Sequence, residues 1–148
     1  MISFDSNILV YAADPAAGER RVRAADLLAR AMRRQVCTQA LQSLCEFFNV
    51  ITRKSGVEAA AAAELVSAWS ASMAVEAARS EDLAAAMRAV SDHHLSFWDA
   101  MLWATVRRVG VHLLITEDLQ DGPVLEGVRF VNPFAAHNGS LIDREIPR

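Results

Sequence analysis

The stretch VHLLITEDLQDG, residues 111–122, decides how the rest of the chain is interpreted. It starts with a short run that is apolar except for His112, and it continues into three acids and an Asp-Gly pair. Such a run predicts a buried strand over Val111–Ile115, and Asp-Gly is typical of a turn. Acids that directly follow a buried strand indicate a parallel sheet whose carboxyl edge carries polar groups.

Outward from this stretch, short apolar segments alternate with helical patterns in both directions. The other predicted strands are Ile2–Asp5, Val36–Thr38, Met73–Val75 and Gly127–Val131, and the predicted helical segments are Asn7–Tyr11, Glu19–Arg34, Gln39–Lys54, Val57–Ser70, Glu81–Asp92 with Ser80 as its N-cap, and Phe97–Val109. This alternation predicts an α/β sandwich around a short, mainly parallel sheet of four or five strands.

The composition fits a single domain, and it argues against a metal site built on cysteines and against a membrane protein. The chain has 148 residues, 53% of them hydrophobic, which is enough for one buried core. We expect both Cys37 and Cys45 to be small buried hydrophobic residues, because neither has a partner at metal-ligand spacing. No apolar run reaches the length of a membrane span, and the N-terminus lacks the pattern of a signal peptide, so we expect a cytoplasmic protein without a membrane segment.

Four acids stand where the predicted topology places the carboxyl edge of the sheet: Asp5, Glu46, Asp99 and Asp118. Each also has an ordinary structural explanation. Asp5 and Asp99 suit helix N-termini, Glu46 suits a solvent-facing polar stripe, and Asp118 suits a turn. If the first and fourth strands are neighbours, however, all four converge. Carboxylates so close together need protons or a cation, and oxygen ligands of this kind suit Mg²⁺ or Mn²⁺ rather than zinc.

Three of these acids lie in motifs that resemble those of the PIN-domain family. FDSNILVY, residues 4–11, is similar to the family's opening motif, and FWDA, residues 97–100, is similar to its third acidic motif. LITEDLQDG, residues 114–122, looks like the fourth motif, whereas Glu46 matches the second acid only by its place in a helix after the second strand. The resemblance runs from Ile2 to about Pro133. Chain length and the early first Asp are most similar to VapC-type toxins.

The resemblance implies a three-layer α/β/α fold and a metal-dependent endoribonuclease, the toxin of a type II toxin–antitoxin pair. It implies hydrolysis of RNA by a metal-activated water, a homodimer, and a cognate antitoxin that holds the enzyme inactive. The residues that match the family's motifs take roles as follows: Asp5, Glu46, Asp99 and Asp118 as catalytic metal ligands, Asp121 and more weakly Glu117 as extra ligands, and Asn7 and Thr116 as supporting polar residues.

The net charge of −3 argues weakly against a nucleic-acid partner, but the basic residues are clustered and all but Lys54 are arginine. We predict phosphate contacts at Arg53 and Lys54, then at Arg20, Arg21 and Arg23. For any single cluster, a solvated helix face is the alternative.

The division expected is a PIN-like nuclease domain over residues 1–133 and a C-terminal tail of unknown role over 134–148. The main alternative function is a catalytically silent PIN-like module that binds RNA or protein. A phosphotransfer domain of the receiver or haloacid-hydrolase type is a weak alternative. A receiver would need a lysine near a later strand, and the only lysine here, Lys54, lies at the end of a predicted helix. A flap-type DNA nuclease usually needs a longer chain with more acids.

Overall fold

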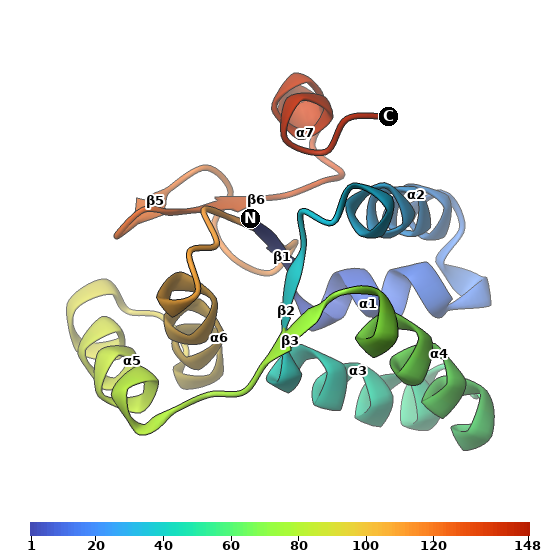
Figure 1. Cartoon of the computed structure of the whole chain (residues 1–148), viewed down its shortest axis with the longest axis horizontal. Helices are drawn as coiled ribbons and strands as arrows, with labels where there is room; N and C mark the ends of the chain where they lie inside the picture. The colour runs from blue at the N-terminus through green and yellow to red at the C-terminus, as the bar shows by residue number, and fades with distance from the viewer.

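The computed structural model describes the whole chain, residues 1–148 (Figure 1). In chain order its elements are β1 Ile2–Phe4, α1 Ser6–Ala13, the 3-10 turn η1 Pro15–Ala17, α2 Glu19–Arg34, β2 Thr38–Ala40, α3 Leu41–Lys54, α4 Ala59–Ser72, β3 Ala74–Glu76, α5 Ser80–His93, α6 Phe97–Arg108, β4 Leu113–Ile115, β5 Val124–Leu125, β6 Val128–Val131, η2 Ala136–Asn138 and α7 Gly139–Glu145.

The four-stranded sheet has the order β1-β4-β6-β5 and confirms the predicted α/β class. Ser3 lies opposite Leu114, and Leu114 lies opposite Phe130, so β4 is the central, fully buried strand flanked by two parallel neighbours. The first and fourth strands are therefore neighbours, which is the condition on which the expected convergence of the acids depended. This pairing brings Asp5, directly after β1, beside the loop that follows β4.

The remaining strands differ from the expectation of one sheet. β2 and β3 form a separate parallel pair, which is connected to the larger sheet through a single bridge between Ile2 and Cys37. The short β5 pairs antiparallel with β6 and was not predicted. Its two residues are too few for alternation to be visible, and the hairpin turn depends on positive φ angles at Glu126 (43°) and Gly127 (88°).

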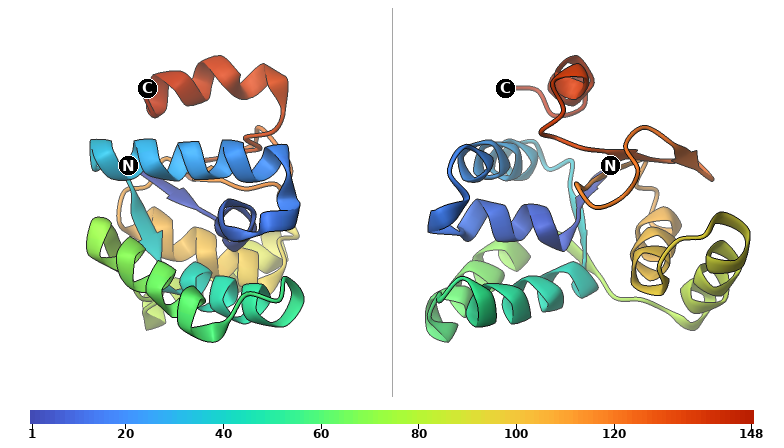
Figure 2. Two further views of the ribbon diagram at one scale, coloured as in Figure 1. Left: turned by 90° about the vertical axis from the view of Figure 1, so that its right-hand side faces the viewer. Right: turned by 180° about the vertical axis from the view of Figure 1, so that it is seen from behind.

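Helices cover the large sheet on both sides, as Figures 1 and 2 show. Helices α1 to α4 lie on one side and α5 and α6 on the other. Two apolar clusters correspond to these layers. One contains Phe4, Leu27 and Phe47 together with side chains of α1 to α4, and the other joins α5 and α6 to Leu114 and Phe130. This arrangement places the carboxyl ends of β1 and β4 between the two helical layers.

Two local expectations were wrong. Ser80 is the first residue of α5 rather than its N-cap, because the Asp82 carboxylate accepts from the backbone N–H of Arg79 at 2.8 Å and starts the helix one residue earlier. Cys37 is buried as expected, but Cys45 is exposed, because it lies on the side of α3 that faces solvent beside α4.

The C-terminal segment forms η2 and α7, and α7 lies beside α2 (Figure 2). Ile142 and Ile146 are fully buried in the same apolar cluster as α2. The buried Arg30 of α2 donates to Asp143 at 2.7 Å and also to the carbonyl of Ile146. The boundary predicted at residue 133 thus lies between two segments that share a core. No helix is both long and apolar enough to cross a bilayer.

Candidate active site

Asp5 lies at the carboxyl end of β1 and is 5% exposed. Its backbone N–H donates to the carbonyl of Ile115 on β4 at 2.9 Å, which fixes its position at the sheet edge. Oδ1 accepts from the backbone N–H of Ser6 at 2.6 Å, so Asp5 is the N-cap of α1. Oδ2 accepts from Thr116 Oγ1 at 2.7 Å and from Asn7 Nδ2 at 3.1 Å. Asp5 is therefore both a helix cap, through Oδ1, and a member of the polar cluster at the sheet edge, through Oδ2.

Glu46 projects from α3 toward the same place. Its Oε2 accepts from Ser6 Oγ at 2.9 Å, and the same hydroxyl lies 3.3 Å from Asp5 Oδ1. Its Oε1 accepts from Gln42 Nε2 at 2.8 Å, one helical turn earlier. A single serine hydroxyl thus lies between two carboxylates that are 41 positions apart in the sequence, which places Glu46 at the Asp5 edge.

Asp99 lies in the first turn of α6, where Ser96 caps the helix. The backbone N–H of Asp99 donates to Ser96 Oγ at 3.2 Å, and that hydroxyl donates to Asp99 Oδ2 at 2.6 Å. Gln42 Nε2, which also binds Glu46, donates to the carbonyl of Trp98 at 3.0 Å. The amide of Gln42 therefore connects the start of α6 to the middle of α3, and Asp99 approaches the same edge from the opposite layer.

The electrostatics of Asp5 reflect both its burial and the two neighbouring carboxylates. Burial raises the pKa of Asp5 from 3.8 to about 6, against the lowering effect of its hydrogen bonds with Thr116 and Ser6. The negative charges of Asp99 and Glu46 raise the pKa of Asp5 further. A cation at this edge would relieve both the repulsion and the desolvation. The donor set, carboxylates with no thiol or imidazole, fits Mg²⁺ or Mn²⁺. As the side chains stand, no three acidic, histidine or cysteine residues are grouped closely enough to hold an ion.

Asp118 is placed near this edge by its backbone alone. Its N–H donates to Thr116 Oγ1 at 3.2 Å, and the residue is exposed, with no hydrogen bond to its carboxylate. Thr116 therefore connects three predicted site residues, because its hydroxyl also contacts Asp5 and, at 3.4 Å, Asn7. The predicted supporting residues Asn7 and Thr116 lie against Asp5 as expected.

The other two acids of this loop have different partners. Asp121 accepts from the backbone of Asn132 at 2.8 Å and from Asn138 Nδ2 at 2.9 Å, and it pairs with His137 Nε2 at 2.8 Å. Its hydrogen bonds with Asn132 and Asn138 and the charge of His137 hold the pKa of Asp121 below its usual range, although burial opposes them. These contacts favour a role in holding the C-terminal segment.

Glu117 accepts from the hydroxyl of Tyr11 and from Arg20 Nη1, both at 2.5 Å. The bond to Glu117 is the main reason that the pKa of Tyr11 is above its usual range. Tyr11, Ser6 and Gln42 were not among the predicted site residues. The signals were present, since Ser6 stands between Asp5 and Asn7, and Gln42 precedes Glu46 by one helical turn, but a serine or glutamine at such positions is common on any helix.

Of the five predicted phosphate-binding residues, three are free, whereas Arg20 and Arg23 have partners. Arg53 and Lys54 are exposed at the end of α3, without ion pairs, beside a shallow hollow of about 220 Å³. Arg53 continues the polar stripe that contains Glu46, about 10 Å further along the helix. Arg21 is exposed and unpaired as well. Arg20, in contrast, is paired with Glu117 and lies 5.1 Å from the ring centres of Tyr11 and Phe134.

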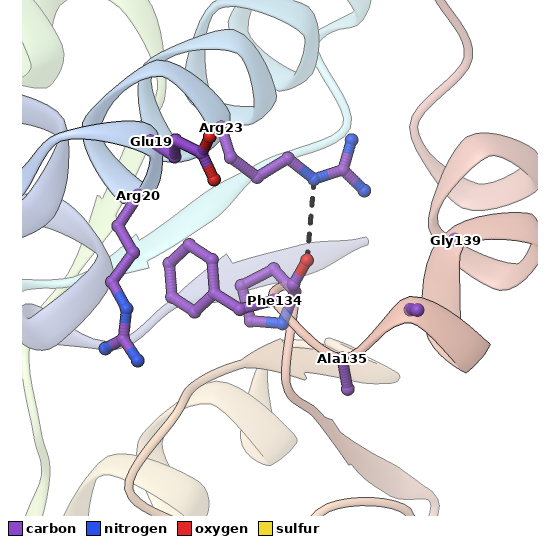
Figure 3. Close-up of a pocket in the computed structure, with 8 residues that line it drawn as sticks. Glu19, Arg20, Arg23, Phe134, Ala135 and Gly139 are labelled. Atoms are coloured by element: carbon purple, nitrogen blue, oxygen red, sulfur yellow. Dashed lines mark hydrogen bonds between the residues drawn. The ribbon is translucent and has the colours of Figure 1, made fainter.

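A cavity of about 480 Å³ lies between the start of α2 and the segment after β6 (Figure 3). Figure 3 shows Phe134 between the side chains of Arg20 and Arg23, and Arg23 Nε lies 3.4 Å from the carbonyl of Pro133. Glu19 also lines this cavity, and the charge of Arg20 is paired with that of Glu117. We therefore treat this cavity as part of the packing of the C-terminal segment rather than as the reaction centre.

Comparisons with known proteins agree with this fold. The family model described as PIN domain matches residues 2–120. The structure is similar to the Mycobacterium tuberculosis toxin VapC20, which cleaves the sarcin-ricin loop, with a TM-score of 0.63 and 23% identity over 77% of this chain and 87% of that one. It is similar to a toxin–antitoxin complex from Klebsiella pneumoniae, with a TM-score of 0.65 and 19% identity over 90% and 98%. PAE2754 from Pyrobaculum aerophilum also matches, with a TM-score of 0.65 and 18% identity over 99% and 96%. A comparison with curated protein sequences finds no match.

Proposed function

Because this chain belongs to the PIN-domain family, we propose that it is a metal-dependent endoribonuclease whose reaction centre is formed by Asp5, Glu46 and Asp99, with Asp118 as a fourth acid. The observation that carries the proposal is the convergence of the first three on one sheet edge from β1, α3 and α6. Ser6 lies between Asp5 and Glu46, and the charges of Glu46 and Asp99 raise the pKa of Asp5.

In this proposal, Asp5, Glu46 and Asp99 hold Mg²⁺ or Mn²⁺, and Asp118 completes the set directly or through water. Such a cation, when bound, supplies an activated water and neutralises charge at the scissile phosphate. Thr116 and Asn7 hold Asp5 Oδ2, while Ser6 and Gln42 hold Glu46, so the acids are oriented before substrate arrives. Supporting hydrogen bonds of this kind set both the direction and the basicity of metal ligands.

Among the neighbouring acids, Asp121 and Glu117 stay weaker candidates for ligation. Both carboxylates are already engaged, Asp121 by Asn132 and Asn138 and Glu117 by Arg20. A move into a metal site would require these bonds to break. We therefore give them structural roles in the proposal.

RNA would approach along the polar face of α3. Arg53 and Lys54 are the free cations on this face, and we assign them to backbone phosphates on one side of the acids. Arg21 is a second free cation, whereas Arg20 would first have to leave Glu117.

For its cellular role, we propose a cytoplasmic toxin of a type II toxin–antitoxin pair, restrained by a cognate antitoxin. The likeness to VapC20 and to the Klebsiella complex supports this role. A homodimer is also proposed. We place its interface at an apolar groove of about 430 Å³ between α3 and α4, whose lining includes Leu41, Cys45 and Phe48. Leu41 is 43% and Phe48 38% exposed, and neighbouring exposed apolar side chains of this kind are typical of protein-protein interfaces.

The test is cleavage of RNA in Mn²⁺ or Mg²⁺ by the wild type and by Asp5→Asn, Asp99→Asn and Asp92→Asn. Asp92 is an exposed acid of α5 without partners, so it controls for the change in charge. We expect the first two variants to lose at least 100-fold in rate, and Asp92→Asn to match the wild type. Equal cleavage by all four proteins, at equal folding, would contradict the assignment. RNA binding without cleavage would favour the catalytically silent module.

A further inference from the structure

Trp98 is the most exposed large hydrophobic residue of the fold after Val22, with 63% of its surface accessible. It directly precedes Asp99 and forms an edge-to-face pair with Phe97, with ring centres 5.1 Å apart and planes at 65°. Phe97 itself is 39% exposed. The other two tryptophans are buried, Trp69 at 8% and Trp103 at 1% exposure. An exposed aromatic pair therefore stands at the start of α6, beside the proposed reaction centre.

The backbone of Trp98 is held in place from the opposite layer. Gln42 Nε2 donates to the Trp98 carbonyl at 3.0 Å and to Glu46 Oε1 at 2.8 Å. One amide group thus connects Trp98 to a proposed metal ligand, and the peptide bond after Trp98 leads to another, Asp99. The distance between the indole and the acids is consequently limited by α6 and by Gln42, not by a mobile loop.

Such a platform suits an unpaired nucleobase. Single-stranded RNA is recognised largely by stacking of its exposed bases on aromatic side chains, and every base has a flat face to offer. Resting on the proposed function, we propose that Trp98 and Phe97 form a stacking platform for a base next to the scissile phosphate. The platform positions RNA whose bases are unpaired, and it disfavours a duplex, whose bases are stacked on each other.

Occupation of the platform by a second copy of this chain is less favourable. Asp99 directly follows Trp98, and Gln42 connects the Trp98 carbonyl to Glu46. A protein face laid over the indole would also cover the carboxylates of Glu46 and Asp99, neither of which is in an ion pair, and burying an unpaired charge is costly. The apolar groove between α3 and α4 offers a separate surface for a protein partner. A nucleotide brings both the aromatic face and, through its phosphate, a place for the cation that the acids need.

The experiment is a tryptophan fluorescence titration in EDTA, with a single-stranded oligoribonucleotide and with the same strand made fully abasic. Because Trp69 and Trp103 are buried, a stacked base can quench only Trp98. We expect quenching by the normal strand, none by the abasic strand, and none in Trp98→Phe. Absence of quenching in the wild type, or equal quenching by the abasic strand, would overturn the platform. So would a blue shift of Trp98 emission that grows with protein concentration alone, since it would show a second copy on the indole.

Cleavage kinetics of Trp98 variants distinguish a role in positioning the RNA from a general effect on folding. Cleavage in Mn²⁺ is measured for Trp98→Ala, Trp98→Phe and, as a control, Met87→Ala, an exposed residue of α5. We expect Trp98→Ala to raise KM about 5- to 100-fold with kcat nearly unchanged, and Trp98→Phe to recover much of the loss. Cleavage with an unchanged KM in Trp98→Ala would reject the platform and leave the proposed function intact. If the wild type cleaves no RNA, the proposed function fails, and the fluorescence arm still decides the platform.

Discussion

At the scale of single residues, Asp5 shows how one side chain serves structure and chemistry. Oδ1 caps α1 through Ser6, and Oδ2 is held by Thr116 and Asn7. The cap explains why an acid is tolerated at this buried position, and the raised pKa shows that the free protein keeps it ionised at a cost. A residue that destabilises the fold when charged, yet is well oriented by its neighbours, has the properties of a ligand for a cation.

A first prediction follows from the pKa of Asp5. A raised pKa means that the folded state binds the proton more tightly than the unfolded state, so stability decreases as pH rises from 3.8 through about 6. Without metal, the stability of Asp5→Asn relative to the wild type should therefore increase by up to about 3 kcal/mol between pH 4 and pH 8, because only the wild type loses this proton. The hydrogen bonds that the amide cannot accept lower the stability of the variant by a similar amount at both pH values, so they leave this change intact. Urea unfolding across this range measures the difference, and a difference that does not change with pH would refute the prediction.

Ser6 carries a second prediction. Its hydroxyl is the only side-chain donor between Asp5 and Glu46, so Ser6→Ala leaves Glu46 Oε2 without its partner while the backbone cap of α1 remains. We expect cleavage to fall about 10-fold, as is usual when a group that orients metal ligands is removed. Thermal unfolding should change little. Ser140→Ala, an exposed site on α7, is the control. A rate equal to that of the control would show that Ser6 does not orient the acids.

Sequence reasoning reached part of this residue-level detail. Asp5, Asn7 and Thr116 were predicted from local motifs, and they do lie in contact. Gln42 was visible only as one member of a polar stripe, because its role depends on the carbonyl of Trp98 in the opposite layer. Asp121 shows the reverse case. Its motif indicated a ligand, but the structure surrounds it with Asn132, His137 and Asn138, which lie beyond the motif.

At the scale of elements, α7 is the clearest departure from what the sequence suggested. Residues 134–148 were expected only as a tail of unknown role, since they lie outside the motifs. The structure gives them a helix, α7, in which Ile142 is fully buried and Asp143 pairs with buried Arg30, and Ile146 directly after the helix is fully buried as well. A seven-residue helix is marginal alone, so its stability comes from packing on α2.

A third prediction tests whether α7 contributes to the stability of the nuclease fold. Ile142→Ala should lower the free energy of unfolding by about 2–4 kcal/mol, because it leaves a cavity in the core shared with α2. Chemical denaturation measures the change, with Ser140→Ala, exposed on the same helix, as control. A loss below 0.5 kcal/mol would show that α7 contributes little to the stability of the fold.

At the scale of the whole molecule, the order β1-β4-β6-β5 is what converts dispersed acids into one site. The alternation of strands and helices predicted the α/β class. That the first and fourth strands are neighbours was a condition that the sequence alone could not establish. The separation of β2 and β3 into their own pair was not predictable, because hydrophobic pattern says which segments are strands but not where a sheet divides. Helix α3 contributes Glu46 to the site, and α6 contributes Asp99 from the opposite layer. This arrangement depends on the topology, so local sequence could not predict it.

The proposed dimer provides a fourth prediction at this scale. Phe48→Glu places a charge in the apolar groove between α3 and α4 and should shift the protein from dimer to monomer with its helix content unchanged. Sedimentation velocity compares it with Met87→Glu, which adds the same charge at an exposed position of α5. If both variants and the wild type sediment as the same species, the groove is not the dimer interface.

If Asp5, Glu46 and Asp99 act together on one cation, the metal-free protein must bind Mn²⁺ through all three. Calorimetric titration with Mn²⁺ tests this for the wild type, Glu46→Gln, Asp99→Asn and the control Asp92→Asn. We expect a saturable site in the wild type and the control, and an affinity about 10-fold weaker or more when Glu46 or Asp99 is neutralised. Equal Mn²⁺ affinity in all four proteins, or no binding by the wild type, would contradict it.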